Sequence, residues 1–138
     1  MTYKFLEHTA DIKVYAEGGS WEEAYEESAM AMKEVILDHE EIEIKKNIKK
    51  KINISGKDPE NLLYNFLEEF LYLLDAEDFV LSKAKVVSVS ENNELEAEVV
   101  GDKISNYNIS NKVKAITYSD MAVVKKGDKF ICEFVLDV

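Results

Sequence analysis

The sequence has no arginine, one cysteine and two histidines, and each scarcity argues against a class of function. A single cysteine cannot form an internal disulfide, and Cys132 lies in an apolar run, where a thiol is usually an inert part of the core. With one thiol, two imidazoles and no glycine-rich phosphate loop, the usual pairs of nucleophile and base are missing. The residue inventory therefore favours a protein that is not an enzyme.

A shortage of positive charge argues against direct binding to nucleic acid. Acidic residues number 28 and basic residues 17, all of them lysines, so that the net charge is −11 and the protein's field repels a phosphate backbone. Without arginine the chain also lacks the planar groups that bind phosphate or guanine through two parallel hydrogen bonds. The local exception is the lysine-rich run from Lys45 to Lys51. Two interpretations of it stay open: protection of a strand edge, and a docking patch.

Long apolar segments are also missing. No run approaches the roughly 18 apolar residues of a membrane-spanning helix, and residues 1–6 are too short and too mixed for a signal peptide. Together with the single cysteine, this predicts a soluble protein of the reducing cytoplasm, with no membrane partner. A chain of 138 residues is expected to form one domain, residues 1–138, with a single solid core.

Two segments carry the signals of helix starts. Ser20 and Glu23 have the spacing of a capping box, and small and apolar residues then recur at intervals of three and four. Asp58 and Pro59 mark a second start, with the aspartate as N-cap and the proline at the first helical position. The apolar stripe that follows, from Leu62 to Leu74, is wide enough for a central helix.

Alternation of apolar and polar residues predicts strands in most of the remaining sequence. Asn92-Asn93 and Gly127-Asp128 suit tight turns with positive φ between successive strands. Strands, then helices, then many strands predict an α+β fold in which two helices pack on one or two mixed, largely antiparallel sheets. The later strands are expected to form an antiparallel meander over residues 80–90, 95–101, 113–118, 121–125 and 129–137.

The two ends of the sequence carry the candidate metal ligands. Asp11 opens one short apolar strand and Asp137 closes another, so each carboxylate is expected on a rigid strand and directed away from the core. If the two strands are neighbours, the carboxylates converge, and the α-carboxylate of Val138 adds a third anionic group. Ligation by oxygen alone favours calcium or magnesium over zinc. The expected cofactor is a divalent cation, with calcium as the first candidate and magnesium or manganese as alternatives.

Each of these residues also has a simpler interpretation. Asp11 can be a turn residue after Thr9-Ala10, and Asp137 an ordinary solvent-facing residue near a chain end. His8 can orient the Asp11 carboxylate through a hydrogen bond, or bind a softer metal directly. It can also be a loop histidine that only forms hydrogen bonds within its own loop.

Three segments, in this order, resemble the archease family: Glu7-His8-Thr9-Ala10-Asp11-Ile12, Lys112 to Tyr118, and Leu136-Asp137-Val138. The resemblance extends along the whole chain and strengthens the metal interpretation of Asp11. It also places Lys114 and Thr117 in a family motif, where they are candidates for contact with the metal site or with a partner. Archeases often have histidine where this chain has Ser119, so no role of that histidine is carried over.

The resemblance implies an accessory function. Archeases promote the guanylylation and the multiple turnover of an RtcB-type RNA ligase in tRNA splicing and RNA repair. For this chain, the resemblance implies that ligase as partner and a divalent cation held by Asp11, Asp137 and Val138. Two alternatives stay open: a metal-dependent hydrolase that uses the acidic cluster with His8 as base, and a chaperone-like modulator of a tRNA methyltransferase.

Overall fold

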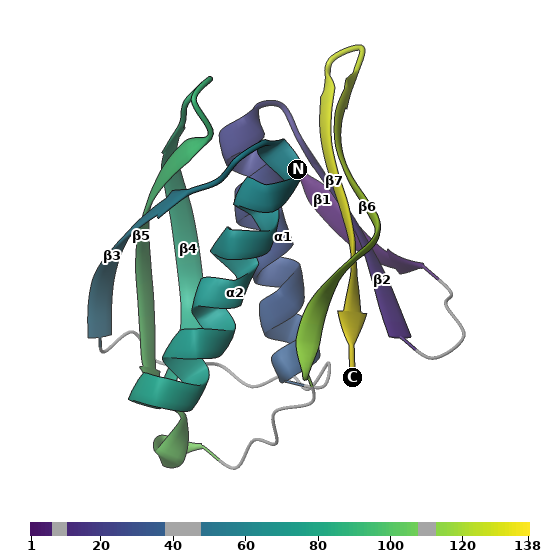
Figure 1. Cartoon of the computed structure of the whole chain (residues 1–138). Coiled ribbons are helices and arrows are strands. Elements are labelled where there is room, and N and C mark those ends of the chain that lie inside the picture. Colours follow the sequence, from purple (N-terminus) through teal and green to yellow (C-terminus); the bar gives the residue numbers. More distant parts are fainter. Residues whose placement is uncertain (7–10, 38–47, 108–112) are drawn as a thin grey trace.

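The computed structural model describes residues 1–6, 11–37, 48–107 and 113–138. These residues form seven strands, two α-helices and one short 3-10 helix (Figure 1). None of the helices in these ranges has the length and apolar character needed to cross a membrane. In chain order the elements are β1 (Thr2–Leu6), β2 (Asp11–Gly18), α1 (Trp21–Ile36), β3 (Ile48–Ser55), α2 (Pro59–Glu77), β4 (Phe79–Val89), β5 (Glu94–Lys103), η1 (Ile104–Asn106), β6 (Ala115–Lys126) and β7 (Lys129–Asp137).

The strands form two sheets that enclose both helices (Figure 1). Sheet A has the strand order β1-β2-β7-β6, and sheet B has the order β3-β5-β4. Helix α1 contacts β2 and β4, and helix α2 contacts β6 and β4, so each helix packs against both sheets. All pairings between the described strands are antiparallel. The predicted α+β class, with two helices on largely antiparallel sheets, is confirmed.

The predicted meander is wrong in one respect, because its strands are divided between the two sheets. β4 and β5 form a hairpin in sheet B, whose turn holds Asn93 at positive φ. β6 and β7 form a hairpin in sheet A, whose turn holds Gly127 at positive φ. Alternation along a strand says which face is buried, but both sheets bury a face against the same two helices. The pattern therefore does not specify which sheet a strand joins.

Side-chain hydrogen bonds cap the N-termini of both helices, as predicted. The Ser20 hydroxyl accepts a bond from the Glu23 N–H at 3.1 Å, and the Glu23 carboxylate accepts one from the Gly19 N–H at 3.0 Å. At α2, the Asp58 carboxylate accepts a bond from the Asn61 N–H at 2.7 Å, and a proline follows in the first turn. These bonds satisfy amides that have no partner within the helix.

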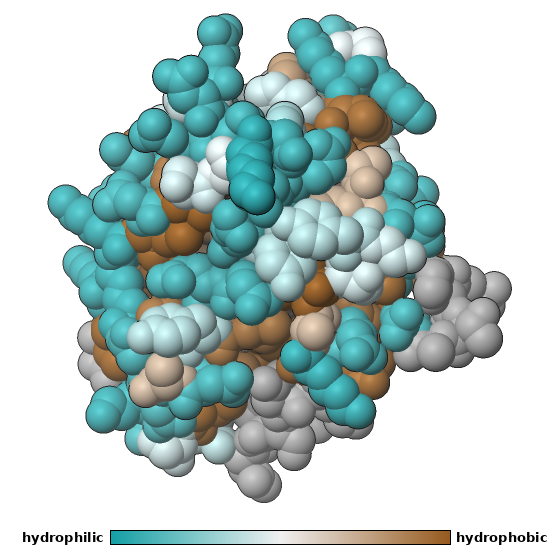
Figure 2. Space-filling view, viewed as in Figure 1, coloured by the Kyte–Doolittle hydropathy of each residue, from teal (hydrophilic) through white to brown (hydrophobic). Residues whose placement is uncertain are grey.

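The core lies between the two sheets and is built around α2. Phe66 of α2 is fully buried, and its ring centroid lies 6.5 Å from that of Tyr25 on α1 and 5.1 Å from that of Phe70. Cys132 on β7 is also fully buried, which confirms its predicted place in the core. On the face drawn in Figure 2, hydrophilic residues cover most of the surface and the apolar areas are small and separate.

Side chains of α1 protect the free edge of sheet B. Strand β4 is the last strand of that sheet, so one side of its backbone has no strand to pair with. The Glu26 carboxylate accepts a bond from the Val86 N–H at 2.9 Å, and Glu22 binds another β4 amide in the same way. The Lys33 ammonium donates to the Ser82 carbonyl at 3.1 Å, and burial lowers the pKa of that ammonium. An edge satisfied in this way is a poor template for pairing with another chain.

Candidate metal-binding site

The candidate metal ligands lie at one end of sheet A, where three strands begin or finish (Figure 1). Strand β2 begins at Asp11, β7 finishes at Asp137, and β6 begins at Ala115. Asp137 is paired with Asp11 on one side and with Ala115 on the other. The segments near the two ends of the chain are therefore neighbours, and this part of the prediction is confirmed.

Asp11 and Asp137 project from the outer face of sheet A. On β2, Val14 and Ala16 are fully buried, so residues of the other parity face outward. On β7, Phe134 is fully buried while Asp137 is exposed. Asp11 and Asp137 are directly opposed on antiparallel strands, so their side chains share this outer face.

The spacing of this pair suits one shared cation. Cβ atoms of directly opposed residues are about 4.5–5.5 Å apart. Oxygens on opposite sides of a calcium ion are about 5 Å apart, because each Ca–O distance is about 2.3–2.6 Å. The side chains of Asp11 and Asp137 need little extension to reach the same ion.

The end of β7 is held in place by its neighbours. The Lys114 N–H donates to the Asp137 carbonyl at 2.7 Å. Leu136 is fully buried, and Val138 is partly buried against the core. This agrees with the continuation of the apolar pattern to the last residue of the sequence. A carboxylate on such a strand starts from a fixed backbone position, as a binding site requires.

The donor set that the structure describes is small and consists of oxygen. Within the described ranges, no group of three or more His, Cys, Asp or Glu side chains is placed to hold a metal ion. Asp11 and Asp137 supply two carboxylates, and Val138, the third predicted ligand, follows one residue beyond the second. Calcium takes six to eight oxygen ligands and magnesium six. These residues fit part of the shell of a hard cation and leave positions for water or for groups of a partner.

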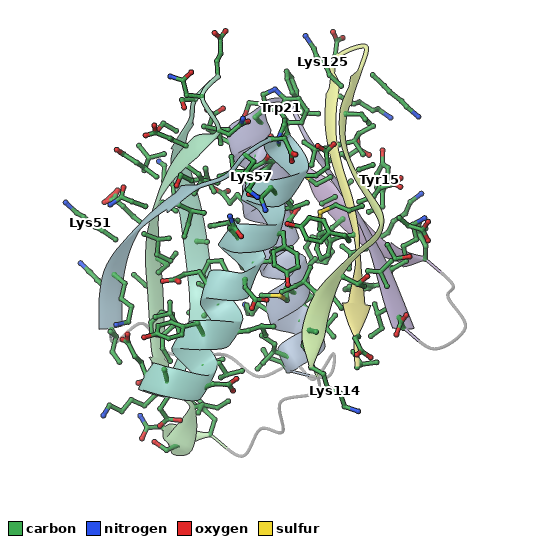
Figure 3. All side chains as sticks on the ribbon, viewed as in Figure 1. Tyr15, Trp21, Lys51, Lys57, Lys114 and Lys125 are labelled. Atoms are coloured by element: carbon green, nitrogen blue, oxygen red, sulfur yellow. The ribbon has the colours of Figure 1, made fainter. Side chains whose placement is uncertain are left out.

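The other predicted residues are placed differently around this pair. Thr117 pairs with Val135, two residues along β7 from Asp137, and so shares the outer face. Its Oγ1 accepts a bond from the Ser119 N–H at 2.9 Å. Lys114 is exposed directly before β6, and its side chain extends away from the body of the protein (Figure 3). His8 lies outside the described residues, so its role stays a prediction.

A bulge interrupts β6 next to the candidate site. Sequence analysis separates residues 113–118 from residues 121–125, and the structure joins them in one strand with a register shift between Thr117 and Ala122. Residues 118–121 lie opposite Phe134 alone, and Asp120 within this stretch has a φ of 60°. Bulges often occur beside functional sites, where they redirect a side chain.

Tyr118 lies at the start of this bulge and has the same parity on β6 as the buried Ile116, so its side chain faces α2. Its ring stacks on the ring of Tyr64 on α2, with centroids 4.4 Å apart and planes 7° from parallel. Its hydroxyl accepts a bond from the Asn61 side-chain amide at 2.5 Å. Sequence analysis assigned Tyr118 only to a motif and gave it no role. No local pattern signals this contact, because both partners lie on a helix more than 50 residues earlier in the chain.

The buried thiol offers no nucleophile near the acidic pair. Burial raises the pKa of Cys132 to about 12, so the thiol stays protonated at neutral pH. The neighbouring Ser28 is buried as well, and its hydroxyl donates to the Ala24 carbonyl at 2.8 Å.

Comparison with known proteins identifies a family. Residues 3–138 match the model of the Archease protein family (MTH1598/TM1083). The protein archease of Sulfurisphaera tokodaii is 37% identical over 138 residues, which cover 99% of this chain and 98% of the relative. The protein archease of Pyrococcus abyssi is 36% identical over 141 residues, with the same coverage of both chains.

Solved structures agree with this match. The solution structure of Methanobacterium thermoautotrophicum protein 1598 superimposes with a TM-score of 0.82 at 28% identity and covers 99% of this chain and 98% of that one. The crystal structure of a Thermotoga maritima archease, described as a possible chaperone, gives a TM-score of 0.60 at 23% identity, with 98% and 96% covered. The second similarity is one of fold alone.

Proposed function

Because the chain belongs to the archease family, we propose that it is a non-catalytic accessory protein that promotes guanylylation and multiple turnover of an RtcB-type RNA ligase. In this proposal it binds a divalent cation, with calcium as the first candidate, and it acts in tRNA splicing and RNA repair. The observation that carries the proposal is the direct pairing of Asp11 with Asp137 across β2 and β7.

The pair of aspartates supports a cation site for an energetic reason. Like charges placed directly opposite each other on adjacent strands destabilise a sheet. A divalent cation between Asp11 and Asp137 removes that repulsion and converts it into attraction. The α-carboxylate of Val138 supplies a third oxygen group at the same edge.

The incompleteness of this site supports a role at the surface of a partner. Three carboxylate groups do not fill the six to eight positions of calcium, so the remaining positions are available to another molecule. A divalent cation supplies charge neutralisation and a template for orienting phosphate oxygens. The proposed task of Asp11 and Asp137 is to present that charge on rigid strands where the ligase binds its nucleotide.

Correct positioning of the reacting groups is the proposed source of the stimulation. Guanylylation requires the ligase histidine to be aligned with the α-phosphate of GTP. Fixing such a geometry contributes up to about 7–11 kcal/mol in favourable systems, and a small part of this suffices for a large change in rate. The net charge of −11 assists docking, because an acidic protein is steered towards a basic, RNA-binding face.

The test combines the purified ligase, GTP and a divalent cation with this protein, and follows formation of nucleotidyl-histidine in the absence of RNA. Wild type is expected to stimulate guanylylation, whereas Asp11→Asn and Asp137→Asn are expected to lose the stimulation. Glu133→Gln is the matched control, because Glu133 lies on the same strand and outer face as Asp137. Full stimulation by either aspartate variant contradicts the proposed role of the pair.

Two further assays separate the alternatives. Hydrolysis of a phosphoester by the protein alone, lost in the same aspartate variants, would identify the metal-dependent hydrolase instead. The third candidate, a chaperone-like modulator, needs a different assay. Stimulation of a tRNA methyltransferase, with no effect on the ligase, would establish that function.

A tag at each end of the chain probes Val138. Extension beyond Val138 converts its α-carboxylate into an amide and removes one oxygen group from the site. A C-terminal tag is therefore expected to weaken calcium binding and ligase stimulation, and the same tag at the N-terminus is expected to do so less. Equal effects of the two tags contradict the use of this carboxylate.

A further inference from the structure

Four lysines lie on the outer face of sheet B. This sheet is on the opposite side of the helices from sheet A (Figure 1). Lys49 and Lys51 come from β3, and Lys83 and Lys85 come from β4. These four residues are called the lysine face. All four side chains are exposed, and Lys51 extends away from the helices (Figure 3).

The strand register arranges the lysine face as a rectangle. Lys51 and Lys85 both pair with Glu98 of β5, and Lys49 and Lys83 both pair with Val100. Residues two apart on a strand are about 6.7 Å apart, and strands separated by one other strand are about 9.6 Å apart. Four ammonium groups therefore start from the corners of an area of about 7 by 10 Å.

These lysines have no structural partner among the described residues. None of the four forms an ion pair with a described carboxylate, although Glu98 lies between two of them. Their neighbour Lys50 is different, because it faces the inner side of β3. Its ammonium lies 2.6 Å from the Glu77 carboxylate and 5.5 Å from the centre of the Phe79 ring. Lys50 has a structural role, and the lysine face has none that these contacts provide.

The lysine face reverses the sign of the protein's charge locally. Its four positive charges and the single negative charge of Glu98 sum to +3, on a protein whose net charge is −11. The lysines and Glu98 line a shallow hollow of about 650 Å³, which Val100 also lines. Exposed charges act over about 8–10 Å at physiological ionic strength, so a group inside the hollow responds mainly to these lysines and Glu98. Glu96 lies two residues along β5 on the same face and acts on such a group more weakly.

We propose that the lysine face binds the sugar–phosphate backbone of single-stranded RNA. This inference rests on the proposed function, which places the protein beside a ligase that holds RNA. Lysine contributes a point charge without the rigid fork that reads a base, so the contact is independent of sequence. Domains that bind double-stranded RNA span about 16 base pairs, whereas an area of about 7 by 10 Å suits a few phosphates of one strand.

The lysine face is an exception to the expectation, drawn from composition, that the protein does not bind nucleic acid. A net charge of −11 predicts weak binding of polyanions by the protein as a whole. It does not describe a surface where four cations surround one carboxylate. Sequence analysis left docking open as a role of the run from Lys45 to Lys51. The structure adds Lys83 and Lys85, which sequence alone does not bring to the same place.

Fluorescence anisotropy of a labelled oligouridylate, titrated with the full-length protein at 50 and 200 mM NaCl, tests the proposal. With four phosphate contacts to a single strand, the logarithmic salt slope is about −2.8, so the affinity falls about 50-fold over this range. Removing two contacts with Lys51→Gln and Lys85→Gln lowers the slope to about −1.4 and the fall to about 7-fold. Glu98→Gln is expected to tighten binding.

A matched variant controls for net charge. Lys57→Gln with Lys126→Gln changes the net charge by the same amount but alters lysines outside sheet B, so its salt slope is expected to equal that of wild type. Equal slopes for both double variants contradict the proposal, as does an absence of binding at 50 mM NaCl. Displacement of the RNA by polyglutamate at an equal concentration of charge would show an acidic polypeptide to be the occupant instead.

Failure of this inference can be told apart from failure of the proposed function. Guanylylation of the ligase needs GTP but no RNA, so the Lys51 and Lys85 variant is expected to stimulate it as wild type does. Asp137→Asn is expected to show the opposite behaviour, with loss of stimulation and an unchanged salt slope of RNA binding. Loss of both activities in both variants contradicts the assignment of two separate surfaces.

Discussion

Replacing Asp137 by asparagine is expected to raise the stability of the calcium-free protein and to remove its stabilisation by calcium. The carboxylates of Asp11 and Asp137 are directly opposed on the outer face of sheet A. Two unit charges about 5 Å apart repel each other by about 0.8 kcal/mol in water, and measured cross-strand pairs contribute about 0.2–1 kcal/mol. Asparagine keeps the shape and removes the charge. The free energy of unfolding without calcium should therefore rise by about 0.5 kcal/mol.

Calcium should stabilise the wild-type protein more than it stabilises Asp137→Asn. A ligand present at 100 times its Kd stabilises the folded state by about 2.7 kcal/mol, which for a chain of this size raises the Tm by about 10 °C. Wild type is expected to show that shift, and Asp137→Asn is expected to lose most of it, because one of the two opposed ligands no longer carries charge.

Thermal unfolding followed by circular dichroism, in EDTA and in excess calcium, measures both quantities. Glu133→Gln is the control, because it removes a charge from the same strand and face, where the Glu133 carboxylate lies 4.0 Å from the Lys13 ammonium. It should keep the full calcium shift, with a change in stability within about 0.5 kcal/mol. A calcium shift equal to that of wild type in Asp137→Asn, or a loss of stability of that variant in EDTA, refutes the reasoning.

Three other predictions test the fold. Cys132, whose pKa burial raises to about 12, should not react with Ellman's reagent until the protein is unfolded in urea; rapid reaction of the native protein contradicts its burial. Glu26→Ala should lower the free energy of unfolding by about 1–3 kcal/mol because the Val86 N–H loses its acceptor, whereas Glu26→Gln should recover most of this loss; equal urea midpoints for the two variants would show that the bond contributes nothing. Burial also raises the pKa of Tyr25 above its ordinary value of 10.0, so the unfolded chain loses this proton first and stability should fall as the pH rises beyond about 10. Tyr25→Phe should flatten that fall, and an unchanged pH profile contradicts the assignment.

The features predicted correctly from the sequence are those decided by neighbouring residues. The caps at Ser20 and Asp58 depend on side chains three positions apart, and both form the expected hydrogen bonds. The turn at Gly127 depends on a residue that tolerates positive φ. The outward direction of Asp11 and Asp137 follows from the period of two along a strand, which places successive side chains on opposite faces.

The features that could not be predicted depend on contacts between distant segments. The stacking of Tyr118 on Tyr64 requires the packing of α2 beside β6. The lysine face requires β5 to pair with β3 and β4 in one particular register, which no local pattern specifies. The adjacency of Asp11 and Asp137 could be predicted only in part. Alternation along each strand predicts the direction of the two side chains, but only the pairing of β2 with β7 brings them together.

The central claim is that the two segments near the chain ends form one cation site. A crystal structure of the protein grown in calcium, with the ion located by its anomalous scattering, tests this most directly. One calcium ion is expected, with an oxygen of Asp11 and an oxygen of Asp137 each about 2.3–2.6 Å away. An ion bound to only one of these residues, or a saturated protein whose calcium lies elsewhere, contradicts it.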